Sequence, residues 1–495
     1  MNRQLNRLAL VAIALIGALV VATTYWQTWA SAGLKDRQDN AIERVVQFTI
    51  ARGLIEGFGK KAVFATNVKH RRGSETLYFR RYPLHGLAAQ TVGYSTKSRS
   101  QAGLERSMND YLTGANTNLT NAFKEIIDRL GSATVHGNTL VLTIRPKVQR
   151  LAQQLLGSQC GAVVAMNPHT GAVYVMASSP TYDPNLIDKP GGYAKVLKIR
   201  GTCGGASALL NRATQGLFTP GSTFKIVTAA AALDTGAFTP SSTFDDPGYC
   251  TEYGQRVSNA GNPETGPETF GRVNFVQGFE HSINSVFCNI GKQIGAKTIL
   301  TYAKRFGFYK TPPLETPGNE RAPSGMYTPR THKLDDNGSK ADPGRLAFGQ
   351  WTMLATPLQM AMVAATVGNG GVVPKPYLVQ KILAPDGSTV RNTKPSNLGR
   401  AIKPQTAADL TTMMVAAVQS GTGTRAQIPG IQVAGKTGTA ETGVNRVYTA
   451  WFVSFAPADN PQVAIAVVLE KQLNGFGGAV SAPIAKQVME ALLAR

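Results

Sequence analysis

The apolar pattern of the chain begins with an uncharged run from Leu8 to Ala22, which has arginines on its N-terminal side. Aromatic residues extend this run to Trp29. An apolar segment of this length with cationic and aromatic flanks predicts a helix that crosses a membrane. A cleaved signal peptide is the alternative, because Ala30-Ser31-Ala32 resembles a cleavage site. We favour an uncleaved anchor over residues 1–30, with the rest of the chain outside the cytoplasm.

Residues 31–138 show a mixed pattern without one long periodic element. A polar, helix-like stretch covers residues 34–53, short β-like runs follow, and a helical piece is expected over residues 116–130. This texture predicts a small non-catalytic pedestal, or dimerisation-type domain, between the anchor and a larger domain.

The pattern changes at Thr139, where a strand (LVLTI) precedes a helix that begins with Pro146. The segments CGAVVAM and AVYVMAS then flank the turn NPHTG, which predicts a β-hairpin. We expect a second, larger domain over residues 139–495.

Strands return near the C-terminal end of the chain. The segments IQVAGKTGTAE, YTAWFVSFAP and QVAIAVVLEK predict three consecutive strands, and SAPIAKQVMEALLAR predicts a closing amphipathic helix. Residues 205–360 instead predict mainly helices and Gly/Pro-rich loops. The larger domain is therefore expected to be mixed α+β, with a sheet whose strands come from both ends of the domain.

The net charge of +22 would suggest nucleic acid as a partner in a cytosolic protein, but the membrane anchor argues against it. Part of the positive charge lies in residues 59–83, close to the anchor in sequence. Anionic lipid head groups or wall polymers are the expected counter-charges there, and an ordinary solvated surface is an equally good reading.

Four cysteines, Cys160, Cys203, Cys250 and Cys288, contain no C-x-x-C pair. In a chain outside the cytoplasm an even number of cysteines permits disulfides, and three pairings are open. The six histidines are scattered without the spacing of metal ligands, so no metal site is predicted.

The stretch PGSTFK places Ser222 and Lys225 three residues apart at the start of an apolar, helix-like run. An ordinary helix N-cap explains this equally well. The alternative is a nucleophile with its own base, because residues i and i+3 share one face of a helix and a buried lysine loses its proton readily.

Two further short motifs follow in the sequence and favour the catalytic reading. Ser282 and Asn284 form a Ser-x-Asn triplet before another apolar run, and Lys436-Thr437-Gly438 stands on one of the predicted C-terminal strands. Each motif alone is weak. The order Ser-x-x-Lys, Ser-x-Asn, Lys-Thr-Gly is the combination of penicillin-binding proteins and class A β-lactamases.

With these motifs the chain resembles a class B penicillin-binding protein, a membrane-anchored peptidoglycan transpeptidase, over nearly its whole length. It is most similar to the compact type A of actinobacteria, because the spacer is short and nothing follows the catalytic domain. The resemblance implies an antiparallel five-stranded sheet with helices on both faces, a helical subdomain, a pedestal domain and an N-terminal membrane helix. Supporting stretches are RGLI, RRYP, AGLERSMNDYLTG, TYDPN, LLNRATQGLFTPGSTFK, AFGQWTMLATPLQMA and AGKTGTAE.

The resemblance also implies a role for each motif residue. Ser222 would attack the D-Ala-D-Ala carbonyl, Lys225 would accept its proton, and Ser282 would relay the proton to the leaving amine. Lys436 would keep Lys225 neutral and orient Ser282, while Asn284 would bind Lys225 and the substrate amide.

The remaining implied roles concern substrate binding. The hydroxyls of Thr437 and Thr439 would meet the terminal carboxylate, and Gly438 would let substrate lie beside the strand. The oxyanion hole would be made of the backbone N–H groups of Ser222 and Thr439.

Two other functions share parts of this pattern. A β-lactamase-like hydrolase carries the three motifs, but no Glu-x-x-Leu-Asn of the class A type follows Ser282. A non-catalytic scaffold of the division or elongation machinery would not require all three motifs.

The resemblance implies peptidoglycan stem peptides and β-lactams as ligands, no cofactor, and a glycosyltransferase and other wall-synthesis proteins as partners. Cys250 and Cys288 flank the loop that leads into the Ser282 motif, and Cys160 and Cys203 lie ahead of the Ser222 helix. These positions favour pairing Cys250 with Cys288 and Cys160 with Cys203.

Overall fold

The computed structural model describes residues 2–28, 48–60, 62–73, 75–97, 101–115, 136–204, 207–262, 266–328, 334–335, 341–350 and 352–494. The helices expected over residues 116–130 and over most of residues 34–53 lie outside these ranges. Within residues 34–53 the structure describes only residues 48–53, and these contain no helix.

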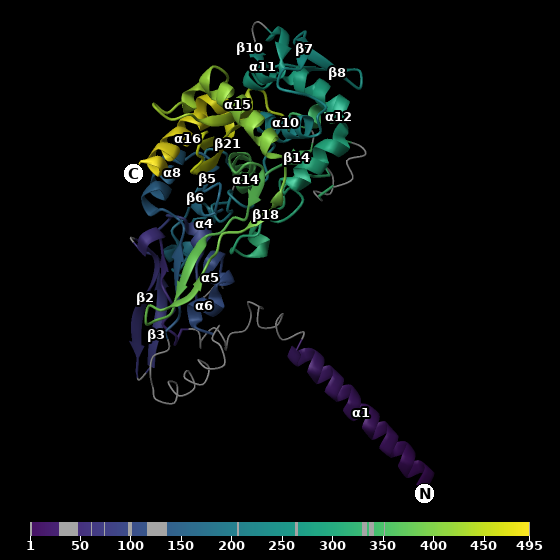
Figure 1. The fold of residues 1–495 in the computed structure, drawn as a ribbon. Helices are drawn as coiled ribbons and strands as arrows, with labels where there is room; N and C mark the ends of the chain where they lie inside the picture. Colours follow the sequence, from purple (N-terminus) through teal and green to yellow (C-terminus); the bar gives the residue numbers. More distant parts are fainter. Residues whose placement is uncertain are drawn as a thin grey trace.

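The N-terminal helix α1 (Asn2–Thr28) carries the apolar run (Figure 1). Its segment Asn6–Tyr25 has a mean hydropathy of 2.4 and is not buried by any other part of the described chain. Its length and composition make it a candidate membrane span.

The centre of the larger domain is an antiparallel five-stranded sheet. Its strand order is β19-β20-β21-β5-β6, so the two ends of the domain meet where β21 pairs with β5. Each of the five strands covers a segment that the sequence predicted. Their bounds are β5 (Gly161–Met166), β6 (Val173–Ser179), β19 (Ala434–Glu441), β20 (Val447–Ala456) and β21 (Val463–Leu473).

Helices cover both faces of this sheet, because alternate residues of each strand point to opposite sides. Val163 and Ala165 pack in one apolar cluster with α8 (Pro146–Leu156) and α16 (Gly477–Leu493). Their neighbours Ala162 and Val164 pack in the other, which contains α14 (Pro357–Gly368) and α15 (Pro404–Gln419). Figure 1 shows α16 and α8 on one side of β21 and β5. All of these strand residues are fully buried.

A helical subdomain stands beyond the second face and includes α10 (Lys225–Asp234), α11 (Phe275–Glu280) and α12 (Asn284–Arg305). Three small β-ribbons flank these helices, although the sequence predicted loops there. The ribbons are too short and too polar for an apolar alternation to mark them. They pair β7 (Thr243–Asp246) with β12 (Gly271–Asn274), β8 (Tyr249–Glu252) with β9 (Gln255–Ser258), and β10 (Gly261–Asn262) with β11 (Gly266–Pro267).

A six-stranded sheet joins the pedestal to the larger domain. Its order is β17-β16-β4-β1-β2-β3, in which β4 starts at the predicted domain boundary and β16 and β17 come from far along the chain. Because β4 lies between β1 and β16, strands from both sides of residue 138 share one sheet. The bounds are β1 (Ile55–Glu56), β2 (Val63–Arg72), β3 (Glu75–Arg81), β4 (Thr139–Leu142), β16 (Val379–Leu383) and β17 (Thr389–Asn392).

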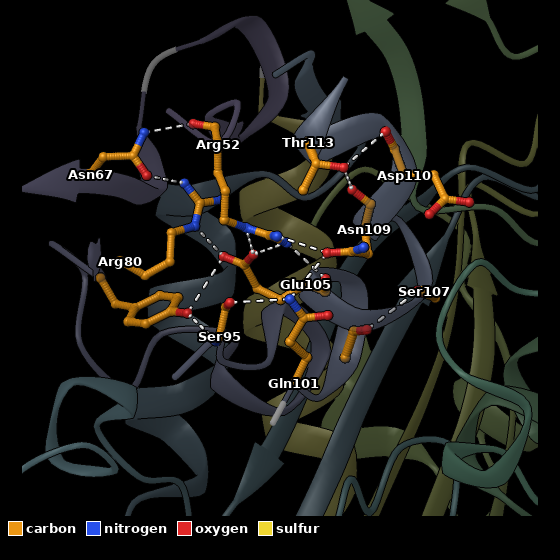
Figure 2. A network of polar contacts seen from close by, with 12 residues as sticks. Arg52, Asn67, Arg80, Ser95, Gln101, Glu105, Ser107, Asn109, Asp110 and Thr113 are labelled. Carbon is orange, nitrogen blue, oxygen red and sulfur yellow. Dashed lines mark hydrogen bonds and ion pairs between the residues drawn. The ribbon is translucent and has the colours of Figure 1, made fainter. Parts of the chain in front are cut away.

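The stretches RGLI, RRYP and AGLERSMNDYLTG converge in the pedestal on one buried carboxylate (Figure 2). Glu105 accepts hydrogen bonds from Arg80 Nε at 2.7 Å and from Arg52 Nη2 at 2.9 Å. The glutamate side chain is fully buried and the two arginine side chains are at most 4% exposed. Burial alone would raise the pKa of Glu105, but the two guanidinium groups outweigh it and the pKa is lowered.

The described chain also contains short α-helices and short strands. They are α4 (Ala89–Val92), α5 (Gly103–Ser107), α6 (Asn109–Thr113), α9 (Gly192–Leu197), α13 (Pro343–Leu346), β13 (Gly325–Met326), β14 (Met353–Leu354), β15 (Val372–Pro374) and β18 (Asn397–Arg400).

The structure contains two disulfides, with the pairing that the sequence favoured. Cys160 bonds to Cys203, with Cα atoms 5.7 Å apart, and Cys250 bonds to Cys288, with Cα atoms 6.4 Å apart. The second disulfide joins β8 to α12.

Candidate active site

Ser222 lies in a 3-10 turn, Gly221–Phe224, that leads directly into α10. Gly221 has a positive φ of 53°, and a Cβ atom there would come within 3.0 Å of the Thr439 carbonyl oxygen. Glycine is therefore needed to bring the turn against β19. The result is a half-buried serine beside the strand that carries the Lys-Thr-Gly motif.

Lys225 is fully buried, and its Nζ atom bonds to the second motif. It donates to the Ser282 carbonyl oxygen at 2.6 Å and to Asn284 Oδ1 at 2.8 Å, and it lies 3.2 Å from Ser282 Oγ. Burial, and then the positive charge of Lys436, lower the pKa of Lys225 well below its usual value. Between Ser222 Oγ and Lys225 Nζ there is no hydrogen bond in this structure.

Ser282 connects α11 to α12 in a strained conformation. Its φ is 61°, a region that residues other than glycine seldom adopt and that is enriched at functional sites. This conformation turns both the carbonyl and the hydroxyl of Ser282 toward Lys225. The Ser-x-Asn spacing predicted a helix start here, but it could not indicate the strain.

A buried polar network fixes the start of α12, and the sequence analysis missed it. Asp246 accepts hydrogen bonds from Ser285 Oγ at 2.5 Å and from Asn259 Nδ2 at 2.9 Å, and Asn259 Oδ1 accepts one from the Ser285 backbone N–H. Burial would raise the pKa of Asp246, but these hydrogen bonds outweigh it and the pKa is lowered. Asn284 is anchored as well, because its Nδ2 donates to the Ser258 carbonyl oxygen at 3.1 Å.

Lys436 is fully buried on β19, and burial lowers its pKa to about 7. Its Nζ atom donates to the Thr437 carbonyl oxygen at 3.3 Å, and it has no hydrogen bond to Ser282 among the described residues. The structure thus places the two lysines near enough to interact electrostatically, while burial is the larger cause of the lowered pKa of Lys225.

The other residues of the third motif lie along β19. Thr437 Oγ1 is 2.6 Å from Thr422 Oγ1, and Thr439 Oγ1 accepts a hydrogen bond from the Gly477 N–H at 3.2 Å. A Cβ atom on Gly438 would come within 2.8 Å of the Pro220 carbonyl oxygen. The immediate need for glycine there is close packing against the serine turn, a reason that differs from the substrate contact expected from the sequence.

Ser222, Ser282, Asn284, Thr437 and Thr439 line one cleft of about 1130 Å³. Three arginines and Thr422 line the same cleft, although the sequence analysis did not select them. The run Ser-Gly-Thr-Gly-Thr at 420–424 could have suggested Thr422, since it precedes the motif strand. The three arginines are Arg256, Arg345 and Arg425. Among the described residues, no three His, Cys, Asp or Glu side chains gather in a group that could hold a metal ion.

Comparison with known proteins adds independent findings to this geometry. Residues 161–490 match the model of the penicillin-binding protein transpeptidase domain. Residues 52–140 match the model of the penicillin-binding protein A dimerisation domain.

The chain is similar over its full length to a curated relative. It is 34% identical to the peptidoglycan D,D-transpeptidase PbpA of Mycolicibacterium smegmatis, covering 100% of this chain and 99% of the relative.

Solved structures of penicillin-binding protein A from M. tuberculosis resemble this one. The ceftriaxone acyl-enzyme has a TM-score of 0.79 at 32% identity, covering 91% of this chain and all of that chain. The penicillin G acyl-enzyme has a TM-score of 0.74 at 33% identity, covering 90% of this chain and all of that chain.

Proposed function

The chain belongs to the penicillin-binding proteins, as a peptidoglycan D,D-transpeptidase of the penicillin-binding protein A type, and we propose that Ser222 is its nucleophile and Lys225 its base. The enzyme cross-links stem peptides through a serine acyl-enzyme and is acylated by β-lactams. The finer assignment of roles rests on the geometry of the site.

The hydrogen bonding of Lys225 is the observation that carries this assignment. A neutral amine has two N–H donors and one lone pair, and the lowered pKa favours the neutral form. The Ser282 carbonyl oxygen and Asn284 Oδ1 can only accept hydrogen bonds, so they take both N–H groups. The lone pair is then left to accept a proton from a serine hydroxyl.

The acylation step follows from these positions. Ser222 Oγ attacks the carbonyl carbon between the two D-alanines, a C–O bond forms, and the hydroxyl proton passes to Lys225 Nζ. Ser282 Oγ, 3.2 Å from Nζ, then relays a proton to the leaving nitrogen. The C–N bond breaks, D-alanine leaves, and the acyl group remains on Ser222 as an ester.

The transfer step runs the same proton path in reverse. An amine of a neighbouring stem peptide loses its proton to the Ser282 and Lys225 pair and attacks the ester carbonyl. A new amide bond forms, the C–O bond breaks, and the proton returns to Ser222. A β-lactam acylates the same serine, but its cleaved ring stays attached.

Substrate binding is proposed to use β19. The backbone N–H groups of Ser222 and Thr439 would form the oxyanion hole, and the hydroxyls of Thr437 and Thr439 would bind the terminal carboxylate. The strand is at the edge of its sheet, so an extended peptide can pair with its outer side where the serine turn does not cover it.

Location and partners are part of the proposal. The arginines before the apolar segment of α1 favour an N-terminus on the cytoplasmic side of the membrane. The catalytic domain then lies outside the cytoplasm. A glycosyltransferase and other wall-synthesis proteins are the proposed partners. A transpeptidase links peptides that are carried on glycan strands, and a glycosyltransferase makes those strands. The division into an anchor (1–30), a pedestal (31–138) and a transpeptidase domain (139–495) is likewise proposed.

Intact-protein mass spectrometry after penicillin treatment tests this function. We expect one adduct of the full drug mass on the wild-type chain, located on the peptide that contains Ser222. When stem-peptide donors and acceptors are supplied without drug, we expect the enzyme to join them into cross-linked peptide dimers. Rapid loss of the adduct with release of hydrolysed drug would instead identify a β-lactamase. A chain that forms no adduct would be a non-catalytic scaffold.

A further inference from the structure

Arg345 lies on the wall of the catalytic cleft with part of its guanidinium unused. Its side chain is 28% exposed, and Nη1 is paired with Asp342 Oδ2. Among the described residues, Nε and Nη2 have no hydrogen-bond partner. Two adjacent donors of one guanidinium are the geometry that binds a carboxylate through two parallel hydrogen bonds.

A buried acidic support holds this arginine in place. Asp342 Oδ1 accepts the Arg345 backbone N–H at 2.9 Å and so caps α13. Glu252 Oε1 accepts the neighbouring Gly344 N–H at 3.1 Å, while Lys292 Nζ lies 4.0 Å from Glu252 Oε2. Burial and the neighbouring Asp342 carboxylate raise the pKa of Glu252.

The same segment is bonded to the nucleophile turn. The Ala347 carbonyl oxygen accepts a hydrogen bond from Thr228 Oγ1 on α10 at 2.7 Å. The Gly349 carbonyl oxygen accepts one from the Gly221 N–H at 3.2 Å. Arg345 is therefore fixed relative to Ser222, which gives a precise position to any group that it binds.

From this arrangement we propose that Arg345 is a specificity residue that binds a carboxylate of the stem peptide other than the terminal D-alanine carboxylate. The proposal rests on the transpeptidase function given above. The terminal carboxylate is assigned to Thr437 and Thr439 on β19, and Arg345 comes from a different element, α13. The carboxylate that it binds belongs either to the donor peptide or to the acceptor peptide.

A purely structural ion pair would not need this exposure. The Asp342 side chain is 2% exposed and accepts a hydrogen bond from only one guanidinium nitrogen of Arg345. The rest of the positively charged guanidinium is therefore available to a ligand in the cleft. Arg256 and Arg425 line the cleft as well. Arg256 lies on an exposed ribbon, with its guanidinium carbon 4.2 Å from the centre of the Tyr249 ring. Arg256 is thus a matched control: a cleft arginine without a buried support.

The donor arm of the test uses two thioester peptides that differ only before the reacting D-alanine, where one side chain ends in a carboxylate and the other in a carboxamide. Thiol release by the full-length wild-type chain is expected to be about tenfold faster per unit concentration for the carboxylate peptide, the effect of one charge-assisted contact. Arg345→Gln should bring the ratio to about one, Arg345→Lys should retain part of it, and Arg256→Gln should retain all of it. Because each ratio is measured within one variant, partial loss of folded protein cancels.

The acceptor arm follows transfer of the same acyl group to two acceptor peptides that differ only in one group beside the reacting side-chain amine, which is a carboxylate in one peptide and a carboxamide in the other. A preference for the carboxylate acceptor that disappears in Arg345→Gln would assign the contact to the acceptor, and a change confined to thiol release would assign it to the donor. The proposal is overturned if Arg345→Gln keeps the wild-type ratio in both arms, or if wild type has no charge preference in either. Absence of any acylation of the wild-type chain would instead refute the transpeptidase function itself.

Discussion

Lys225 Nζ donates a 2.6 Å hydrogen bond to the carbonyl oxygen of Ser282, a residue with a φ of 61°. The strained backbone of one motif thus serves as an acceptor for the lysine of another. A backbone acceptor cannot be titrated and cannot rotate away, so it fixes one N–H of Lys225 at any pH. The hydroxyl of the same residue remains available for proton transfer.

Replacing Ser222 with alanine is expected to abolish covalent penicillin labelling and leave the fold intact. The half-buried side chain loses only a hydroxyl, and the turn is held by the packing of Gly221 against β19. Gel fluorescence with a labelled penicillin measures the effect, and the melting temperature measures the fold. Labelling of the variant at the wild-type level would show that another residue is the nucleophile.

Removal of the Lys436 charge should shift the pH dependence of acylation. If Lys225 is the base, as proposed, it must be neutral to act, so the limiting rate should fall as the pH drops through the pKa of Lys225. Lys436, with a pKa of about 7, is charged below neutral pH and lowers the pKa of Lys225 there. In Lys436→Ala the pKa of Lys225 rises, and the acid limb of the rate profile should move to higher pH.

Stopped-flow acylation at several penicillin concentrations separates the limiting rate from affinity at each pH. Lys436→Arg should retain more of the limiting rate than Lys436→Ala, because it keeps the charge in a misplaced position. An unchanged limiting rate and acid limb in Lys436→Ala, with only weaker binding, would restrict Lys436 to carboxylate binding.

The disulfide between Cys250 and Cys288 is expected to matter for catalysis as well as stability. Cys288 lies one turn after Asn284 on α12, and Cys250 pairs across its ribbon with Val257, next to Ser258. Replacing both cysteines with serine should lower the free energy of unfolding by about 2–4 kcal/mol and slow acylation severalfold.

The matched control replaces Cys160 and Cys203, which form the other disulfide, far in sequence from the Ser-x-Asn motif. That variant should lose a similar amount of stability but keep its acylation rate. Equal acylation rates in both double variants would show that the Cys250–Cys288 bond does not position the site.

Glu105 is expected to contribute strongly to the stability of the pedestal. Glu105→Gln leaves Arg52 and Arg80 buried without a counter-charge, which should cost about 3–5 kcal/mol of unfolding free energy at pH 7. The folded pKa of Glu105 is lowered, so its contribution is full above the unfolded value of 4.5 and is lost as the pH falls through the folded pKa.

Denaturant unfolding of both chains at pH 7 and at decreasing pH should therefore show a difference that shrinks in acid. Asp110→Asn, which changes an exposed carboxylate on α6, is the control and should differ from wild type by less than about 1 kcal/mol. A Glu105→Gln chain as stable as the control at pH 7 would contradict the prediction.

Local patterns allowed the sequence to predict much of this structure. The strand β5 is a continuous buried apolar run, and β20 and β21 each contain a long, mostly apolar buried stretch. The three-residue spacing of Ser222 and Lys225 places both at one helix start. Such features depend on residues close in sequence, and one sequence is sufficient to reveal them.

Features that depend on distant residues could not be predicted in the same way. The pairing of β4 with β16 brings together Leu140 and Ile382, which no periodicity connects. The buried support of Arg345 joins a polar ribbon to a one-turn helix, and no apolar pattern marks either segment. The left-handed backbone of Ser282 is imposed by its neighbours and has no signature in the residue type.

The shared six-stranded sheet limits how this enzyme can be divided or recombined. A cut at residue 138 would strip β4 from its parallel partner β1, and it would separate β1, β2 and β3 from the β4, β16 and β17 half of their sheet. Neither half then contains the complete six-stranded sheet. A chimera with a related enzyme must exchange three separate segments together, namely β1 to β3, β4, and β16 with β17. An insertion at this junction would separate β4 from β1 for the same reason, so the position of the catalytic domain relative to the pedestal is a fixed dimension rather than an adjustable one.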